Sequence, residues 1–443
     1  MDEDYENGKE HPATTNGNDS HDSHPGGDEL KQATNGNVND ALAPAESTIY
    51  VSHLKNAEAH PAYMRYGVPL FFVCLLILLI NAYVGSGVSA QYILLRDGVV
   101  QEQRELLVAS IFTSVGKLWN NGSYPLAVFI VITSISWPFV KIFISLYVWC
   151  WPYTRPRRRE FVLEVIDALG KWSFVDIVVF VQIMVAFRSS IVLAPGVTLD
   201  IVVVAKWGFY GFVLATMLSL LSSHFLLVRH RKVHYHDLVQ EQAASDLDSK
   251  KGMKARGNLS NTFMIMAMFA VLVSLVFYIV GCVVHIFQVS NTRGENTSSQ
   301  DYSVVSVGHA VPESQLEPNG FGTRFIQFMW FFLCVAMPLW CTLLFGIVFV
   351  FPFSKVWLER AFFMGEIAFA WSCAEVLLVS TVFAVLQMPT FGDGLIKADC
   401  TACFIVGTAI LPNFAFLCIG SFLSVTINVW LYRKAHSVVY GIA

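Results

Sequence analysis

Long apolar runs separated by polar connections dominate the chain after about residue 60. About eight of these runs exceed the roughly 18 residues that predict a membrane-spanning helix. They lie near residues 66–86, 124–151, 163–188, 202–228, 262–288, 325–353, 361–388 and 403–431. Hydrophobic residues make up 55% of the chain and charged residues only 14%, which excludes a soluble globular protein. We therefore expect an all-α polytopic membrane protein.

The polar positions divide the chain into five segments. Residues 1–60 are rich in Asn, Asp, Gly, His and Pro, a composition that predicts a disordered tail. Residues 61–229 and 261–434 contain four apolar runs each, residues 230–260 form a basic linker, and residues 435–443 a short C-terminal end. In both halves the first connection is long and the next two are short. This matching predicts two pseudo-symmetric four-helix modules.

A short motif recurs in the third run of each half. The sequence LGKWSFVD over Leu169–Asp176 is echoed by AFAWSCAE over Ala368–Glu375. The matched pairs are Trp172 and Trp371, Ser173 and Ser372, Asp176 and Glu375, and, just before the motif, Asp167 and Glu366. The shared spacing supports a tandem duplication.

Ionisable residues inside the runs are the first candidates for a functional site, because burying an acid there costs about 2.5–3.5 kcal/mol. Lys141 and Asp176 lie at similar depth in consecutive spans, so an ion pair between them is expected. Cys341 stands at the counterpart of Lys141, so Glu375 is expected to lack a partner and to be neutral. The pair could line a polar route or form a structural salt bridge, and Glu375 could be a proton-linked group or a neutral hydrogen-bonding group.

Other residues of the runs have more ordinary interpretations. Ser173 and Ser372 lie one turn before the acids and share their helical face. Proline in mid-span kinks a helix and frees a carbonyl, and tryptophan commonly anchors a helix at the membrane boundary. Residues expected to have such structural or interface roles are Pro138, Asp167, Trp172, Pro338, Glu366 and Trp371.

Lysine and arginine placement predicts the orientation of the spans. Basic residues concentrate in 155–159, 229–256 and 433–434, so these segments and both ends of the chain should face the cytosol. Two glycosylation sequons, at Asn121 and Asn296, lie in the long first connections on the opposite side. We expect both to be glycosylated.

Candidate ligands for a metal or cofactor are sparse. The histidines of the tail, which are expected to be solvated, are His11, His21, His24, His53 and His60. His224 and His285 lie in apolar runs and are expected to be buried core residues. Cys400 and Cys403 form an isolated CxxC that leaves a disulfide open but makes zinc binding improbable. We expect no metal and no cofactor.

Neither catalysis nor nucleic-acid binding is indicated. The chain contains no Walker loop, no GxSxG, no HExxH and no Gly-rich dinucleotide turn, so no enzymatic activity is expected. The net charge is −4 and the basic residues are confined to connections, so no nucleic-acid surface is expected.

Three segments carry a family resemblance: Ser123–Lys141, Leu163–Ile177 and the turn Ala194-Pro-Gly. They resemble the paraquat-inducible protein A family of bacterial inner-membrane proteins, well over about 100–210 and more weakly over about 320–430. The resemblance implies two tandem four-helix modules. It also implies a role in moving lipids between membranes beside partners with mammalian cell entry (MCE) domains.

Matching by motif carries family positions onto this chain, and the chain also departs from the family. The matched positions are Lys141, Trp172, Ser173 and Asp176 in the first half and, in part, Trp371, Ser372 and Glu375 in the second. Family members typically carry a CxxC-type zinc ribbon ahead of the modules, where this chain has a Cys-free polar tail. The tail and the sequons suggest a eukaryotic member without zinc, for which an MCE-type partner is an open question.

The combined hypothesis is a protein that loads or passes membrane lipids along a polar route between its helices. The residues expected to line this route are Lys141, Ser173, Asp176, Ser372 and Glu375. One alternative is a proton- or ion-coupled transporter of a small solute. Another is a scaffold that organises partners through its tail and long loops without transporting anything.

Overall fold

The computed structural model describes residues 52–55, 60–97, 99–120, 122, 124–152, 156–194, 196–234, 261–293, 296–351, 355–396 and 405–440. Residues from Ile49 onward form one compact unit. Asn121, Cys400 and Cys403 lie outside the described residues, so the predictions about them stay predictions.

Eight helical segments among the described residues are long and apolar enough to cross a membrane. They are Ala62–Val84, Ala127–Cys150, Arg158–Ala186, Trp207–Val233, Thr262–Val283, Phe321–Val350, Arg360–Pro389 and Phe414–His436. The predicted class of helical membrane protein is confirmed. In the third segment 78% of the apolar window is buried, against 28% in the first and 22% in the fifth. The third segment is therefore central, and the first and fifth present most of their surface outward.

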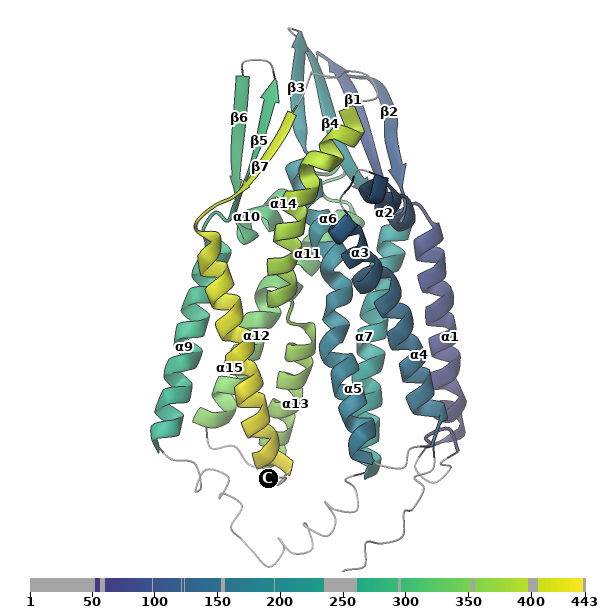
Figure 1. The fold of residues 1–443 in the computed structure, drawn as a ribbon, viewed down its shortest axis with the longest axis vertical. Helices are drawn as coiled ribbons and strands as arrows, with labels where there is room; N and C mark the ends of the chain where they lie inside the picture. The colour runs from purple at the N-terminus through teal and green to yellow at the C-terminus, as the bar shows by residue number, and fades with distance from the viewer. Residues whose placement is uncertain are drawn as a thin grey trace, which may run out of the picture. The chain divides into compact units, whose positions relative to one another are not determined.

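The two halves contain nearly the same series of helices (Figure 1). In the first half these are α1 (Ala62–Val84), α2 (Ile111–Asn120), α3 (Tyr124–Ile130), η2 (Val131–Ser136), α4 (Trp137–Cys150), α5 (Pro156–Gly170), η3 (Lys171–Phe174), α6 (Val175–Ala186) and α7 (Trp207–His234). In the second half they are α9 (Asn261–Val283), α10 (Val304–Ala310), α11 (Phe321–Phe331), η4 (Phe332–Ala336), α12 (Met337–Val350), α13 (Lys355–Trp371), α14 (Ala374–Ile396) and α15 (Phe414–Tyr440).

Seven described strands form two antiparallel sheets that the sequence analysis did not predict. The first sheet has the order β2-β1-β4-β3, with β1 (Val88–Arg96), β2 (Val99–Ala109), β3 (Ser189–Ala194) and β4 (Val197–Ala205). The second has the order β6-β5-β7, with β5 (Phe287–Arg293), β6 (Asn296–Tyr302) and β7 (Ile405–Ile410). The strands lie at one end of the helices, here called the sheet end (Figure 1). The opposite end, where α4 and α7 terminate, is here called the tail end.

Strands β4 and β7 also explain why two predicted spans began too early. The fourth span begins at Trp207 and the eighth at Phe414, rather than near 202 and 403. The residues just before each helix are apolar and rich in Val and Ile, which favour a half-buried sheet. A hydropathy pattern alone merges such a strand with the helix that follows it.

The second span of each half has a π-helical segment just before its proline. Pro138 lacks the N–H that would bond the Ser134 carbonyl, and the Tyr83 hydroxyl donates to that carbonyl instead. In the second half the Tyr278 hydroxyl donates to the Cys334 carbonyl at 2.6 Å, four residues before the matching proline. Both helix breaks are therefore stabilised by a tyrosine from the first span of the same half.

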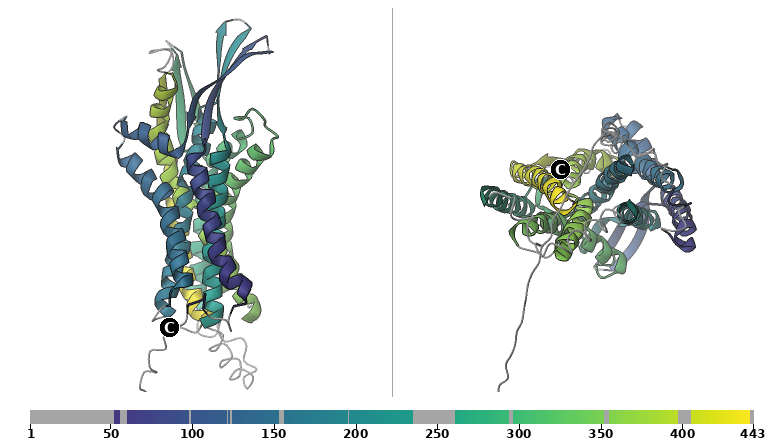
Figure 2. Two further views of the ribbon diagram at one scale, coloured as in Figure 1. Left: turned by 90° about the vertical axis from the view of Figure 1, so that its right-hand side faces the viewer. Right: turned by 90° about the horizontal axis from the view of Figure 1, so that it is seen from below.

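The third spans join the two halves and are interrupted at the repeated motif. Helices α6 and α14 pack together, and the Gln182 amide donates to the Thr381 hydroxyl at 2.9 Å. The break in the first half is the turn η3, and in the second half the Cys373 N–H donates to the Leu333 carbonyl at 3.2 Å. Seen from the tail end, the two halves lie side by side (Figure 2).

The predicted disordered tail is wrong at its C-terminal end. His53 and His60 are 4% and 1% exposed, and His53 Nδ1 lies 2.9 Å from His60 Nε2. The His53 ring stacks on Trp149 at the end of α4, with 5.1 Å between ring centroids. The two imidazoles are therefore buried at the tail end rather than solvated, because aromatic and histidine rings there provide a surface for them.

Candidate functional site

A cavity of about 460 Å³ lies at the sheet end of the first half. Its walls come from α2, α6, α7 and the start of β1, with Gln387 of α14 at one side. Most of the lining is apolar and includes Val179, Phe180, Ile183 and Phe212. This volume lies within the range of about 300–1,000 Å³ typical of ligand pockets.

Two charged side chains line this cavity. Asp176 lies in the first turn of α6, where the Ser134 hydroxyl of η2 interacts with its carboxyl. Lys117 comes from α2. Neither side chain forms an ion pair with any residue that the structure describes. The cavity thus combines apolar walls with one acid and one base that are free to meet a ligand.

Helix α2 separates the cavity from the surroundings of the protein. Ser114, Lys117 and Leu118 face the cavity, whereas Phe112 and Trp119 on the other side of the helix are 52% and 51% exposed. Exposed aromatic residues on an amphipathic helix are typical of a helix at a membrane interface. Helix α2 therefore forms a wall of the cavity and carries exposed aromatic residues on its other side.

The predicted ion pair between Lys141 and Asp176 is not formed. Lys141 is buried at 2% exposure, but its side chain reaches toward the tail end: a Cβ on Gly170 would lie only 2.5 Å from Lys141 Nζ. Gly170 precedes Asp176 by six residues on the third span. Equal depth of the two backbones did not bring the side chains together, because a lysine side chain is long enough to shift its charge along the span.

Glu375 has an ion-pair partner, which the sequence analysis did not expect. Lys171, the first residue of η3, forms an ion pair with Glu375 Oε1 across the interface of the two halves. Lys171 is 3% exposed, and its ammonium also lies 4.6 Å from the Phe369 ring centroid. The expectation that Glu375 lacks a partner is therefore wrong. Lys171 was overlooked because its counterpart in the second motif is Ala370.

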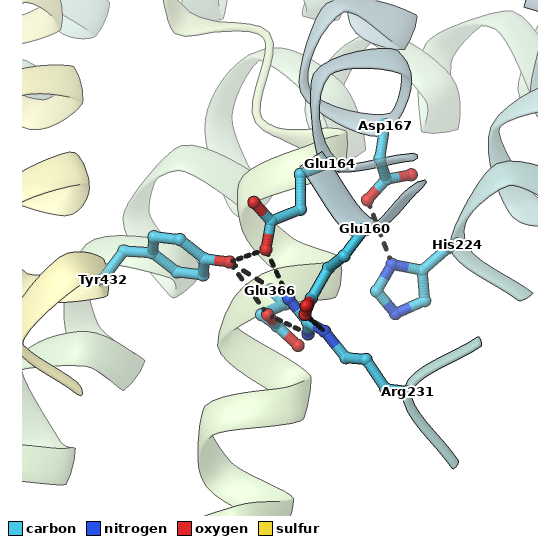
Figure 3. Close-up of polar contacts among 7 residues, drawn as sticks. All are labelled: Glu160, Glu164, Asp167, His224, Arg231, Glu366 and Tyr432. Carbon is cyan, nitrogen blue, oxygen red and sulfur yellow. Dashed lines mark hydrogen bonds and ion pairs between the residues drawn. The ribbon is translucent and has the colours of Figure 1, made fainter. Parts of the chain in front are cut away.

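A second charged cluster joins the halves nearer the tail end (Figure 3). The Arg231 guanidinium of α7 donates to Glu160 at 2.8 Å, Glu164 at 2.7 Å and Glu366 at 2.6 Å. The Tyr432 hydroxyl lies 3.2 Å from Glu366 Oε1. Glu366, predicted to be structural, thus bonds an arginine of the other half. The sequence analysis did not single out Arg231, because it lies in a run of basic residues that is typical of an ordinary loop boundary.

Glu160, Glu164 and His436 also bring potential metal ligands within 4.8 Å of one another. The Arg231 guanidinium donates to both carboxylates, so these acids already have a cationic partner. The contacts of this cluster join α5 and α7 of the first half to α13 and α15 of the second.

The remaining predicted residues lie mostly inside the protein. His224 is buried as expected and lies 3.1 Å from Asp167 Oδ2, whereas His285 is exposed at the sheet end of α9. Trp371 is only 5% exposed and packs against Phe174 of the first half, so it is not a membrane anchor. The buried or partly buried residues that do not reach the cavity are Trp172, Ser173, Ser372 and Pro338.

A comparison with known protein families matches the stretch of chain that supplies most of the cavity lining. The family model described as paraquat-inducible protein A matches residues 100–227, which extend from β2 to α7 and include Lys117 and Asp176. Over this stretch the chain is similar to the paraquat-inducible protein A family. The family match and the eight spans together make it an integral, multi-pass membrane protein.

Curated relatives of the family match a shorter stretch. The protein named intermembrane transport protein PqiA is 30% identical to this chain over 87 residues, in Escherichia coli K12 and in Shigella flexneri. The match covers 18% of this chain and 21% of each relative. The chain thus spans about a fifth of the length of the curated relatives it matches.

Proposed function

We propose that this protein binds membrane lipids in the cavity behind α2 and takes part in their transport between membranes. The observation that carries the proposal is the cavity itself, which combines apolar walls with Asp176 and Lys117. Apolar walls suit acyl chains, and the polar groups suit a headgroup. The name of the curated relatives, intermembrane transport protein, supports the same class of activity.

The charges in the cavity favour a particular kind of headgroup. A carboxylate without a cation partner is costly in an apolar environment. A zwitterionic phospholipid would bring its ammonium group to Asp176 and its phosphate to Lys117, and so offset both charges. Lipid would enter beside α2, whose exposed Phe112 and Trp119 suit the membrane interface.

Transfer of labelled phospholipid between proteoliposomes and acceptor vesicles tests this proposal. Ser114→Trp places a bulky ring in the cavity and should reduce transfer roughly tenfold or more, as expected for loss of a well-filled pocket. Gly116→Leu is the matched control, because a side chain at Gly116 of α2 meets nothing within 4 Å. Asp176→Asn should reduce transfer of zwitterionic lipid in a folded protein. Unchanged transfer by Ser114→Trp would contradict the proposal.

A second candidate function is ion- or proton-coupled transport. The buried Lys171 and Glu375 pair favours it, because intramembrane ionisable residues commonly belong to ion or proton pathways. The same proteoliposomes, studied with and without a pH gradient, distinguish the two. If the gradient drives uptake of a small solute while lipid transfer is absent, this second function is correct.

We also propose that the tail end faces the cytosol. Basic residues concentrate there, and β6 begins at Asn296 at the opposite end. Enzymatic deglycosylation should shift the electrophoretic mobility of protein made in a eukaryotic host. Asn121→Gln with Asn296→Gln should abolish that shift. Glycan at Asn18 or Asn258 would reverse the orientation.

A further inference from the structure

A second hollow lies between α1 and α7, near the tail end and away from the cavity behind α2. It is a groove of about 360 Å³. Residues along it include Met64, Gly67 and Phe71 of α1 and Leu218, Ser222 and Phe225 of α7. Its rim is open to the surroundings, since Tyr63 is 75% exposed and Leu221 is 51% exposed. An apolar groove on the outer face of a membrane-spanning helix pair is the right environment for an acyl chain.

The groove is hollow because of a glycine on α1. A Cβ placed on Gly67 would meet nothing within 4 Å, so space remains where other residues would fill it. The neighbouring wall on α7 includes the small side chain of Ser222. This open position also offers a way to fill the groove without disturbing its neighbours.

Basic side chains lie at the tail end of the groove. Arg229 and Lys232 follow Phe225 by four and seven residues on α7, so all three lie on one face of the helix. The Arg229 guanidinium is 5.5 Å from the Phe225 ring centroid, directly beyond the apolar wall. Neither cation forms an ion pair among the residues that the structure describes.

The pKa of His60 is affected by basic side chains at the same end of the groove. Burial lowers the pKa of His60 most, and the charges of Arg229, Arg159 and Arg65 lower it further. The Arg65 Nε–H donates to the Leu54 carbonyl at 2.6 Å rather than to an acid. The end of the groove thus carries the positive charges of Arg229 and Lys232, neither of which is paired with an acid among the described residues.

We propose that the groove between α1 and α7 binds one anionic phospholipid, with an acyl chain along the groove and the phosphate at Arg229 and Lys232. Basic residues beside membrane helices attract anionic headgroups, and each adds about tenfold or less to binding. The apolar groove distinguishes this site from a diffuse basic surface, because it holds the chain as well as the headgroup. The site is independent of the proposed lipid transport, since it lies at the other end of the first half.

Native mass spectrometry of the full chain in phosphatidylcholine nanodiscs with a minority of phosphatidylglycerol tests this site. The wild-type protein should retain phosphatidylglycerol in preference to phosphatidylcholine. Arg229→Gln with Lys232→Gln should weaken that retention by roughly 30-fold, from the loss of two cations. Gly67→Leu should weaken it too, because it fills the groove and leaves both charges in place.

Arg360→Gln is the matched control for charge. Arg360 is an exposed arginine near the start of α13, also at the tail end, and its guanidinium lies 5.4 Å from the Trp357 ring centroid. This variant should retain phosphatidylglycerol like the wild type. Equal loss in Arg360→Gln, or equal retention of the two lipids by the wild type, would overturn the proposal. Retention by Gly67→Leu would overturn the role of the groove, and circular dichroism confirms that each variant is folded.

Discussion

Helices α2 and α10 follow the first hairpin of their respective halves, yet they pack in opposite ways. In α2 only Leu118 is buried among its described side chains, and the cavity lies behind the helix. In α10 both Val304 and Val307 are fully buried, and the Trp330 indole donates to the Val304 carbonyl at 2.9 Å. The Gln327 amide adds a bond to the Gly308 carbonyl at 3.0 Å. Helix α2 is a largely exposed wall of the cavity, whereas α10 is held against α11.

The matched acids of the two halves differ in the same sense. Asp176 lines the cavity beside Ser134, whereas Glu375 is paired with Lys171 in the interface between the halves. The repeat therefore preserves the positions of the acids but not their partners. In the first half the acid faces a cavity, and in the second half the acid is part of the contact between the halves.

The largest effect is expected from breaking the Lys171 and Glu375 pair. Lys171→Met or Glu375→Gln alone should destabilise the protein by about 3–5 kcal/mol, because each leaves a buried charge or polar group without its partner. The double variant should cost less than the sum of the two. Thermal unfolding in detergent measures all three.

Lys206→Gln with Glu105→Gln is the control for this cycle. These residues form an ion pair at 2.7 Å, but their side chains are 37% and 45% exposed. Their loss should leave the unfolding temperature unchanged. Additive effects in the Lys171 and Glu375 cycle would mean that the two residues do not interact.

A smaller loss is expected when α10 is forced away from α11. A Cβ on Gly308 would lie 2.5 Å from Phe331 and 2.7 Å from Trp330, so Gly308→Ala overpacks the contact. Such overpacking typically costs about 1–3 kcal/mol. Urea unfolding should show this loss. A neutral result would mean that α10 is as loosely held as α2.

Acidification should release the segment around His53 from the tail end of the first half. Burial and nearby positive groups, first Arg159, lower the pKa of His53 from 6.5 to about 2. Between about pH 2 and 6.5, His53 is protonated when its segment is released but neutral when the segment is docked. Docking is therefore at full strength above about pH 6.5 and weakens as the pH falls. The loss approaches about 1.4 kcal/mol per pH unit.

Tryptic cleavage after Lys55 measures this release, and it should accelerate as the pH is lowered within the range where the protease is active. His53→Phe is the control, because it keeps a ring against Trp149 but cannot gain a proton. Because burial also lowers the pKa of His60, a weaker pH dependence should remain in this variant. A pH dependence as steep as that of the wild type would assign the effect to another group.

How far the sequence predicts this molecule depends on the range of the interaction. Span lengths and the repeated motif depend on local patterns, so the eight helices and the matched acids were found. The strand β4 was missed because its apolar residues run directly into α7. The partners of Glu375 and Glu366 were missed because Lys171 and Arg231 meet them across the two halves, and a single sequence does not state how two bundles pack. The cavity depends on the distance at which α2 stands from α6, which hydropathy does not specify.

The smallest effect should have the opposite sign and tests α2 directly. A Cβ on Gly116 meets nothing within 4 Å, so Gly116→Ala introduces no clash and removes the entropic disadvantage of glycine within a helix. We expect α2 to gain about 0.5–1 kcal/mol, which slower hydrogen exchange of its amides would reveal. Gly308→Ala in α10 should do the reverse, so the pair of variants compares the two helices with one chemical change. If Gly116→Ala speeds exchange instead, α2 packs against another surface and is not the free wall of the cavity, and lipid entry beside it would need another route.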